Sequence, residues 1–176
     1  MKPRPTARTM DDKPTHVLTK LGFLSEARRF AWYPPFWLMR PKVLEHAEGW
    51  KHVRIKLPLT WASKNAAGNM FGGYQANLAD PVPAIACVKH FPGYRVATKH
   101  LELEFLRVGN SDLTLHFDLS DEQMTTIQQE LCEHQRSTPC FNMHYVREDG
   151  QVCTVIRNTI AIRPIGYIGR GDRSSC

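Results

Sequence analysis

The alternation of apolar and polar residues restricts this chain to a sheet that encloses a single long helix. It has a period of two in residues 51–59, 100–107 and 112–120, as in half-buried strands. Residues 141–164 predict two further strands joined by an Asp-Gly turn. Only residues 65–89 offer a long helix. Burying one helix against an antiparallel sheet requires strong curvature, so we predict an α+β fold with a curved antiparallel sheet wrapped around a central helix.

Two shorter helices are predicted outside this arrangement. The first begins at Ser25 in the sequence SEARRFAWY and ends before Pro34, because proline interrupts a helix. The second lies near residues 121–135, where Ser120 and Gln123 match a capping box and apolar residues follow at helical spacing. We therefore expect an extra N-terminal helix and an extra helix near residues 121–135.

The two ends of the chain differ in composition from its middle. Residues 1–22 are basic and predict a flexible tail, and residues 166–176 are rich in Gly, Ser and Arg and predict a disordered tail. The tails carry most of the formal net charge of +6, which leaves about +2 on the single domain predicted for residues 23–165. We therefore expect no clustered basic face of the kind that binds nucleic acid.

Composition and cysteine usage favour a soluble protein of the cytoplasm. Of the 176 residues, 42% are apolar and 23% are charged, as in a globular protein with one domain. No stretch approaches the roughly 20 apolar residues of a transmembrane helix, and the N-terminus lacks the apolar core of a signal peptide. The five cysteines include no CxxC pair, so we expect neither a disulfide framework nor a zinc ribbon. The eight histidines lack metal-ligand spacing, so no metal is expected.

A pair of glycines stands where the central helix should begin. Gly72 and Gly73 follow a loop that contains a further glycine. The first turn of a helix exposes unpaired backbone N–H groups, and glycine lets a ligand approach them closely. N–H groups directed at an oxygen that gains negative charge form an oxyanion hole. Close helix packing is the alternative explanation of a Gly-Gly pair considered alone.

Asp80 lies in the otherwise apolar run Leu78-Ala79-Asp80-Pro81-Val82. Burial of a carboxylate without a partner is unfavourable, so a functional role is indicated, with a helix-capping or exposed aspartate as the alternative. Asp80 follows Gly73 by seven residues, so both face one side of a helix but lie about 10 Å apart along it. If they act on one carbonyl, they come from two subunits whose helices lie side by side. We expect a homodimer, and a tetramer stays open.

These residues resemble a known family. The strings Phe71-Gly72-Gly73 and Leu78-Ala79-Asp80 are similar to the HGG…LAD motif of hot-dog fold acyl-CoA thioesterases of the phenylacetate-degradation type, with the same gap between glycine and aspartate. The segment 105–109, Phe-Leu-Arg-Val-Gly, resembles the strand and turn after the central helix of that family. The resemblance covers about residues 50–163 and implies a hot-dog fold and hydrolysis of an acyl-CoA or acyl-carrier-protein thioester, without a cofactor.

The resemblance also implies roles for individual residues. A backbone N–H at Gly72 or Gly73 would polarise the thioester carbonyl, and Asp80 would act as nucleophile or as general base. Asn65 would help to place water or the thioester. Apart from the resemblance, substrate contacts are expected from Asn69, Phe71, Lys99, Arg107 and Arg163. The three cations lie in or at the ends of predicted strands and are candidates for the phosphates of CoA, with ordinary solvated charges as the alternative.

The sequence departs from the family pattern at two places. Phe71 replaces the histidine that often precedes the glycine pair, so the site becomes more apolar. Pro81 and Pro83 remove the donors that the carbonyls of Asn77 and Ala79 would use in a continuous helix. We therefore predict a kink or break beside Asp80.

Two rival functions stay open. Residues 90–93, His-Phe-Pro-Gly, match the residues around the catalytic histidine of hot-dog acyl-carrier-protein dehydratases, but here they follow the central helix, so we interpret them as a turn. The other rival is a non-catalytic hot-dog protein that binds an acyl thioester or a fatty acid. The proline beside Asp80 and the absent histidine are both compatible with this non-catalytic function.

Overall fold

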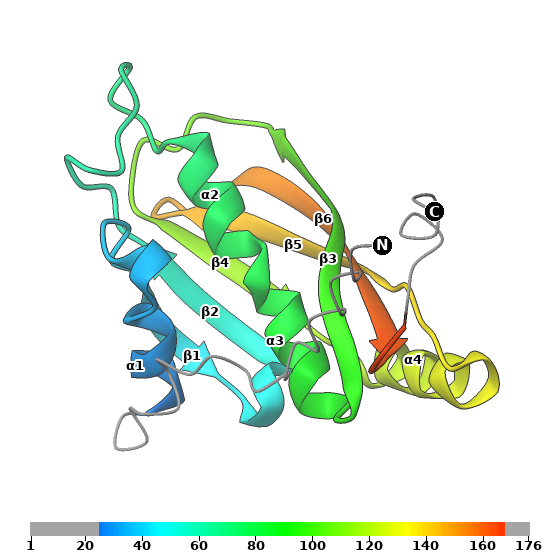
Figure 1. The fold of residues 1–176 in the computed structure, drawn as a ribbon. Helices are drawn as coiled ribbons and strands as arrows, with labels where there is room; N and C mark the ends of the chain where they lie inside the picture. The colour runs from blue at the N-terminus through cyan, green and yellow to red at the C-terminus, as the bar shows by residue number, and fades with distance from the viewer. Residues whose placement is uncertain (1–24, 168–176) are drawn as a thin grey trace, which may run out of the picture.

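Six antiparallel strands form one sheet in the computed structural model, which describes residues 25–167 (Figure 1). The order of the strands across the sheet is β1-β2-β4-β5-β6-β3, so β1 and β3 form its two edges. The strands are β1 (Lys42–His46), β2 (His52–Leu57), β3 (Tyr94–Phe105), β4 (Leu113–Asp118), β5 (Cys140–Arg147) and β6 (Val152–Pro164).

The alternating residues of the sequence become the two faces of this sheet. In β2, Val53, Ile55 and Leu57 are fully buried, whereas the residues between them are half-buried. The strands β4 and β5 follow the same pattern, and β4 lies between β2 and β5. The inward-facing side chains therefore form one continuous core, as the period of two predicts.

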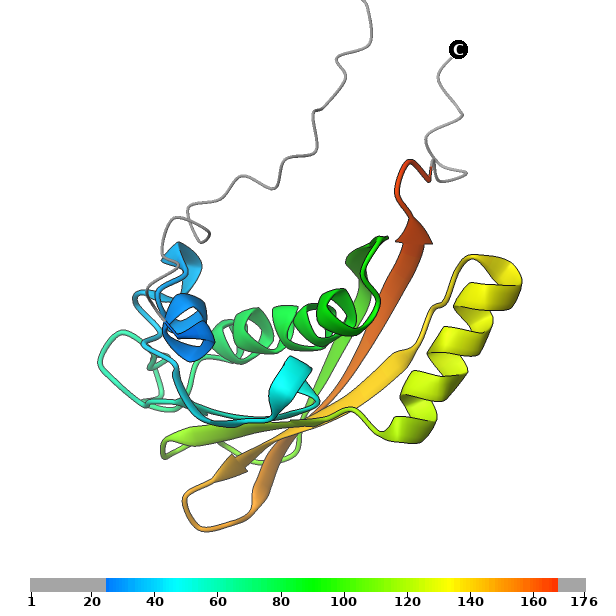
Figure 2. The same cartoon turned by 90° about the horizontal axis from the view of Figure 1, so that it is seen from below.

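The central helix lies across the inner face of the curved sheet in two pieces, α2 (Gly72–Ala79) and α3 (Pro81–His90) (Figure 2). Leu78, Val82 and Ala86 are fully buried and form the side of the helix that contacts the sheet. Asp80 lies between the two pieces, as the prolines predicted. Its backbone stays helical, with φ −54° and ψ −54°, so the break is local and the helix keeps its direction (Figure 1).

The two extra helices are confirmed. Helix α1 (Glu26–Ala31) is capped by the Ser25 hydroxyl and is followed by a 3-10 turn at Pro34–Phe36. Helix α4 (Asp121–His134) carries the complete capping box of Ser120 and Gln123 and lies beyond the end of the sheet (Figure 2). A second 3-10 turn, Glu48–Trp50, joins β1 to β2.

The structure differs from the sequence prediction mainly at the sheet edges. Strand β1 was not predicted, and β3 begins at Tyr94, several residues before the predicted start at residue 100. The predicted tails lie outside the described residues, apart from Gly166 and Tyr167. Among residues 25–167, no helix combines the length and hydropathy needed to cross a membrane.

Buried hydrogen bonds fix the first turn of α2 to the sheet. The Tyr145 hydroxyl donates to the backbone carbonyl of Gln75 at 2.9 Å, and the Thr154 hydroxyl donates to the Gln75 side-chain oxygen at 2.7 Å. All three residues are buried. Burial disfavours the phenolate and raises the pKa of Tyr145 well above its ordinary value, so the hydroxyl stays a donor. The position of the helix start therefore depends on β5 and β6.

We expect Tyr145→Phe to lower the free energy of unfolding by about 1 to 2 kcal/mol, because the Gln75 carbonyl then loses a buried donor. Urea denaturation followed by circular dichroism measures the change. The matched control is Tyr33→Phe, since the Tyr33 side chain is 43% exposed. Removal of its hydroxyl should change the free energy of unfolding by less than about 0.5 kcal/mol. Equal effects of the two substitutions would contradict the prediction.

Candidate active site

The start of α2 presents backbone N–H groups that the helix leaves unpaired. Phe71 precedes the helix and supplies no side-chain cap, while its carbonyl accepts from the N–H groups of Tyr74 and Gln75. Within the described part of the chain, the N–H groups of Gly72 and Gly73 have no hydrogen-bond partner. Both point out of the helix start, where the helix dipole favours negative charge.

Both glycines lie against aromatic rings. A Cβ atom at Gly72 would lie 2.9 Å from Cζ of Phe105, and one at Gly73 would lie 2.5 Å from the ring of Phe71. These rings are themselves half exposed, at 55% for Phe105 and 50% for Phe71. The unpaired N–H groups are therefore flanked by apolar surface, which strengthens a hydrogen bond made there.

The loop before the helix is held by Asn65. Its side-chain oxygen accepts from the backbone N–H groups of Ala67 at 3.0 Å and Asn69 at 3.1 Å. Its own N–H donates to the carbonyl of Asn69 at 2.8 Å. The oxygen of the Asn65 carboxamide is thus used within the loop, and its NH₂ group is the part that is left for water or a substrate.

Asp80 is half-buried at the junction of α2 and α3. Its backbone N–H donates to the carbonyl of Ala76 at 3.0 Å, and its side chain does not cap α3. No residue between 25 and 167 forms a hydrogen bond or an ion pair with its carboxylate. The carboxylate is therefore available to an external group, although within the chain it lies about 10 Å along the helix from Gly73.

Asn158 on β6 supports the backbone at Asp80. Its side-chain NH₂ donates to the carbonyl of Asp80 at 3.0 Å and lies 3.5 Å from the carbonyl of Ala79. Pro83 has no N–H, so the helix offers the Ala79 carbonyl no donor. Asn158 is completely buried, and its side-chain oxygen has no partner among residues 25–167. A donor from the sheet therefore compensates for the proline.

The three predicted phosphate contacts lie at different places. Arg107 is near the helix start, but its guanidinium donates to the carbonyl of Val152 at 2.9 Å. Lys99 is exposed on β3 at an irregularity in the pairing with β6. Arg163 donates to Thr138 at 2.8 Å and lies nine residues along β6 from the partner of Phe105, a separation of about 30 Å. The structure does not bring Arg163 to the helix start.

The other reactive side chains of the central helix give no alternative site. Burial raises the pKa of the Cys87 thiol to about 12, so this thiol stays protonated and is a poor nucleophile. His90 ends α3, and Gly93 adopts a positive φ of 89° in the turn that leads to β3. The His-Phe-Pro-Gly segment is thus a turn after the central helix, as predicted.

Sequence reasoning missed Asn158 and the bonds to Gln75. A signal for Asn158 was present, because Ile156, Asn158 and Ile160 occupy inward positions of one strand and only the middle residue is polar. A buried polar side chain in such a position is expected to have a specific partner. For Gln75, the partners are 70 and 79 residues distant in the chain, and no local pattern points to them.

Comparison with protein families finds a match over most of the described chain. The family described as "Domain of unknown function (DUF4442)" matches residues 24–163. No curated protein matches the chain.

Solved structures named as thioesterases share the architecture. A Pseudomonas aeruginosa protein of unknown function, described as a probable thioesterase, has a TM-score of 0.71 and 17% identity over 83% of this chain and 95% of its own. A Haemophilus influenzae thioesterase has a TM-score of 0.61 and 13% identity over 82% and 94%. A Staphylococcus aureus thioesterase has a TM-score of 0.55 and 16% identity over 74% and 98%. The predicted hot-dog fold is therefore confirmed.

We expect Asn158→Leu to lower the free energy of unfolding by about 1 to 3 kcal/mol, because the buried carbonyl of Ala79 and the partly buried carbonyl of Asp80 each lose a donor. Pro83→Ala restores an N–H for the Ala79 carbonyl. Pro83→Ala should therefore raise the free energy of unfolding more in the Asn158→Leu background than in the wild type. A double-mutant cycle by urea denaturation measures this coupling. A coupling free energy of zero would mean that Asn158 does not compensate for the proline.

Proposed function

The chain belongs to the family described as Domain of unknown function (DUF4442), and we propose that it is a thioesterase that hydrolyses acyl-CoA or acyl-carrier-protein thioesters. The observation that carries the proposal is the pair of unpaired N–H groups at Gly72 and Gly73 together with the unpaired carboxylate of Asp80. Thioester hydrolysis needs both kinds of group: donors for the carbonyl oxygen and a carboxylate that activates water. The thioesterase names of the structural neighbours agree with this chemistry.

The spacing of two residues in a neighbour supports the assignment. In the Staphylococcus aureus thioesterase, a glutamine and a glutamate have each been replaced by alanine, and they lie 15 positions apart. Asn65 and Asp80 also lie 15 positions apart. Each pair combines a carboxamide with a carboxylate further along the chain. We assign to Asn65 the placing of water or the thioester through its NH₂ group, and to Asp80 the role of general base.

The proposal requires two subunits. Gly73 and Asp80 are separated by about 10 Å along the axis of one helix, and a single thioester carbonyl does not reach both. Strand β3 is a long edge strand, and no strand of the described chain covers its outer side. Two copies of β3 paired about a two-fold axis would continue the sheet and set the central helices side by side and antiparallel. Asp80 of one subunit would then lie near the partner subunit's Gly73.

In the reaction that we propose, the thioester oxygen accepts hydrogen bonds from Gly72 and Gly73 of one subunit. Asp80 of the other subunit takes a proton from water, and the water oxygen adds to the carbonyl carbon. The electron pair moves to the carbonyl oxygen, where the N–H groups stabilise it. The carbonyl then reforms, the C–S bond breaks, and the leaving thiolate takes the proton from Asp80. The products are a carboxylic acid and a thiol.

We expect Asp80→Asn to lower kcat by about 100-fold or more while the fold is retained, since general-base catalysis contributes at least this much. Release of free thiol from a series of acyl-CoAs measures the rate, and circular dichroism checks the fold. Glu122→Gln, which changes an exposed carboxylate on α4, is the control and should keep the wild-type rate. Unchanged hydrolysis by Asp80→Asn would remove Asp80 from the mechanism.

Subunit mixing tests whether the site is shared. Asp80→Asn and Gly73→Val should each be inactive, the second because its side chain meets the Phe71 ring at the helix start. After the two are unfolded and refolded together, half of the dimers are mixed and each contains one intact site, so about a quarter of the wild-type activity should return. If no activity returns although light scattering shows dimers, each site lies within one subunit.

The non-catalytic rival makes a different prediction for the wild type. An acyl-binding protein would bind decanoyl-CoA saturably and release no thiol from it. The same thiol assay, combined with calorimetric titration, separates the two functions.

A further inference from the structure

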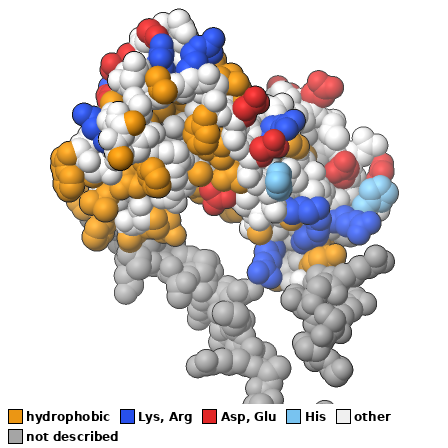
Figure 3. Space-filling model, turned by 90° about the horizontal axis from the view of Figure 1, so that it is seen from above, with side chains coloured by type: hydrophobic (Ala, Val, Ile, Leu, Met, Phe, Trp, Pro, Cys, Tyr) orange, Lys and Arg blue, Asp and Glu red, His pale blue; other side chains and the backbone are white. Residues whose placement is uncertain are grey.

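Four large apolar side chains are exposed in the short segment between α1 and β1. Trp32, Tyr33, Trp37 and Leu38 are 62%, 43%, 64% and 62% exposed, and we call these four residues the apolar face. Figure 3 shows hydrophobic side chains gathered on one side of the molecule, the side on which α1 lies in Figure 1. Tryptophan is mostly buried in folded domains. Two exposed indoles in one segment therefore indicate a surface that binds something.

Packing inside the domain fixes the exposure of these side chains. The Phe36 ring is buried and contacts the Tyr33 ring edge-on, at a centroid distance of 5.5 Å. The indole N–H of Trp37 donates to the carbonyl of Trp32 at 2.9 Å, which ties the two exposed tryptophans together. The residues of this segment that are buried in the core are Phe30, Phe36 and Met39. The segment is thus anchored on one side and presents the apolar face on the other.

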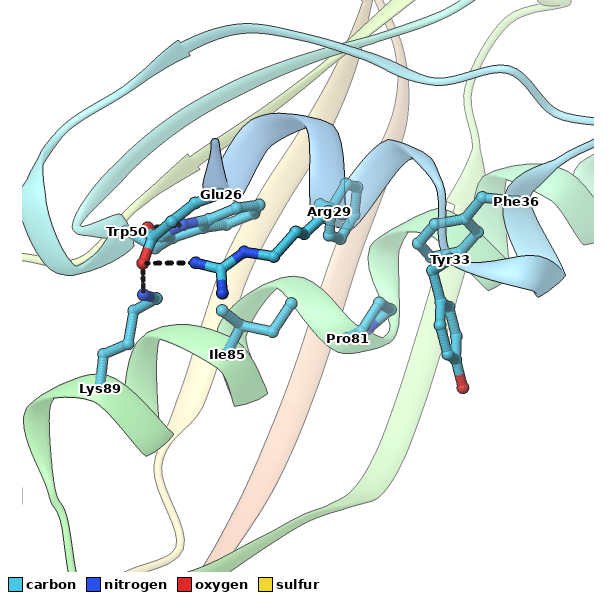
Figure 4. A pocket seen from close by; sticks show the side chains of 9 residues that line it. Glu26, Arg29, Tyr33, Phe36, Trp50, Pro81, Ile85 and Lys89 are labelled. Carbon is cyan, nitrogen blue, oxygen red and sulfur yellow. Dashed lines mark hydrogen bonds and ion pairs between the residues drawn. The ribbon is translucent and has the colours of Figure 1, made fainter. Parts of the chain in front are cut away.

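The single acidic residue of this segment is neutralised by the domain itself. Glu26 of α1 forms ion pairs with Lys89 of α3 and with Arg29, and accepts a hydrogen bond from the Trp50 ring N–H at 3.1 Å (Figure 4). The hydrogen bond from Lys89 lowers the pKa of Glu26, so the carboxyl is ionised at neutral pH and stays paired. These bonds hold α1 on α3 and leave no unpaired negative charge in residues 25–44.

The formal net charge of the protein is concentrated in the same part of the chain. Residues 1–44 contain nine Lys and Arg residues and three Asp and Glu residues, which gives +6. Residues 45–176 contain 14 residues of each sign, so their charges cancel and the whole chain also carries +6. The apolar face therefore belongs to the one strongly basic part of the protein, which favours an anionic partner.

Three exposed cations flank the apolar face in the chain. Arg28, Arg40 and Lys42 form no ion pair with any residue between 25 and 167. Arg40 has a φ of 50°, in the left-handed region that favours glycine, so a cation is present here against the preference of the backbone. Exposed Trp, Tyr and Leu beside unpaired Arg and Lys are the combination that holds peripheral proteins on lipid surfaces.

We propose that the apolar face binds the surface of a membrane that contains anionic lipids. The side chains of Trp32, Trp37 and Leu38 enter the boundary between the head groups and the acyl chains. Arg28, Arg40 and Lys42 contact the lipid phosphates. Apolar burial and charge attraction act together, which is what stable attachment to a membrane surface requires. The inference goes beyond the proposed hydrolysis and does not depend on it.

Other occupants of the apolar face fit the observations less well. A second copy of the chain, paired through the same face, would bring two basic segments together, and like charges repel. Residues 1–24 carry five Lys and Arg residues against two Asp residues, so they are also repelled by this surface. A protein partner is typically anchored in pockets. Of the four residues of the apolar face, only Tyr33 lines a pocket in the described part of the chain.

The test is sedimentation of the full chain with vesicles. One set of vesicles is phosphatidylcholine alone, and the other is an equal mixture of phosphatidylcholine and phosphatidylglycerol. The wild type should bind the mixed vesicles about tenfold or more tightly than the neutral ones. Raising the NaCl concentration from about 0.05 to about 0.5 M should weaken binding to the mixed vesicles, because salt screens the attraction.

Matched variants show whether the apolar part of the face is responsible. The double variant Trp32→Ala, Trp37→Ala should weaken binding to mixed vesicles by about tenfold or more, because two indoles no longer leave water. Leu38→Ala should also weaken it. Ile165→Ala is the control for Leu38→Ala, since Ile165 has a side chain of the same composition, is 70% exposed and follows β6. This control should bind as the wild type does, and circular dichroism checks the fold of each variant.

A second pair of variants separates local from total charge. Arg28→Gln, Arg40→Gln should weaken binding to mixed vesicles by about tenfold or more. Arg95→Gln, Arg136→Gln removes the same net charge at two exposed positions outside the segment and should have a smaller effect. Equal effects of the two double variants, or failure of the wild type to bind mixed vesicles, would overturn the proposal. In the second case, light scattering and acrylamide quenching of the tryptophans would show whether a second copy or residues 1–24 cover the apolar face.

Discussion

The first turn of an α-helix contains N–H groups that no carbonyl of the same helix can satisfy, and the candidate site is built around this constraint. Most helices meet it with a capping side chain, as α4 does with Ser120. At the start of α2 no such side chain is present, and Gly72 and Gly73 leave the N–H groups open between two aromatic rings. Tyr145 and Thr154 hold this first turn from the sheet side. The protein thus fixes the helix start firmly and leaves its donors free.

The break beside Asp80 also leaves a backbone group that the helix itself cannot satisfy. Proline within a helix leaves a carbonyl without a donor, and such a group is unfavourable when buried. Asn158 provides a donor from β6, so the chain keeps its helical direction at Asp80. The sheet therefore stabilises both functional positions of the helix: the start, through Gln75, and the middle, through the Asp80 backbone.

Local patterns in the sequence predicted the features that depend on neighbours in the chain. The start of α2 at Gly72, the capping box at Ser120 and the turn at Gly150 are all of this kind. Strand β1 was missed because it is short and mostly exposed, so its sequence need not alternate between apolar and polar residues. The first half of β3 is stabilised by pairing with β6 rather than by its own composition. The ion pair between Glu26 of α1 and Lys89 of α3 could not be predicted either, since the two residues are 63 positions apart in the chain.

Phe30 and Phe36 come from a part of the chain that precedes the sheet, whereas the proposed catalytic groups lie on the central helix. Phe30 and Phe36 can therefore change in evolution independently of Gly72 and Asp80. Mutations in the N-terminal segment can alter the packing of Phe30 against Trp50 without changing a residue of the proposed site.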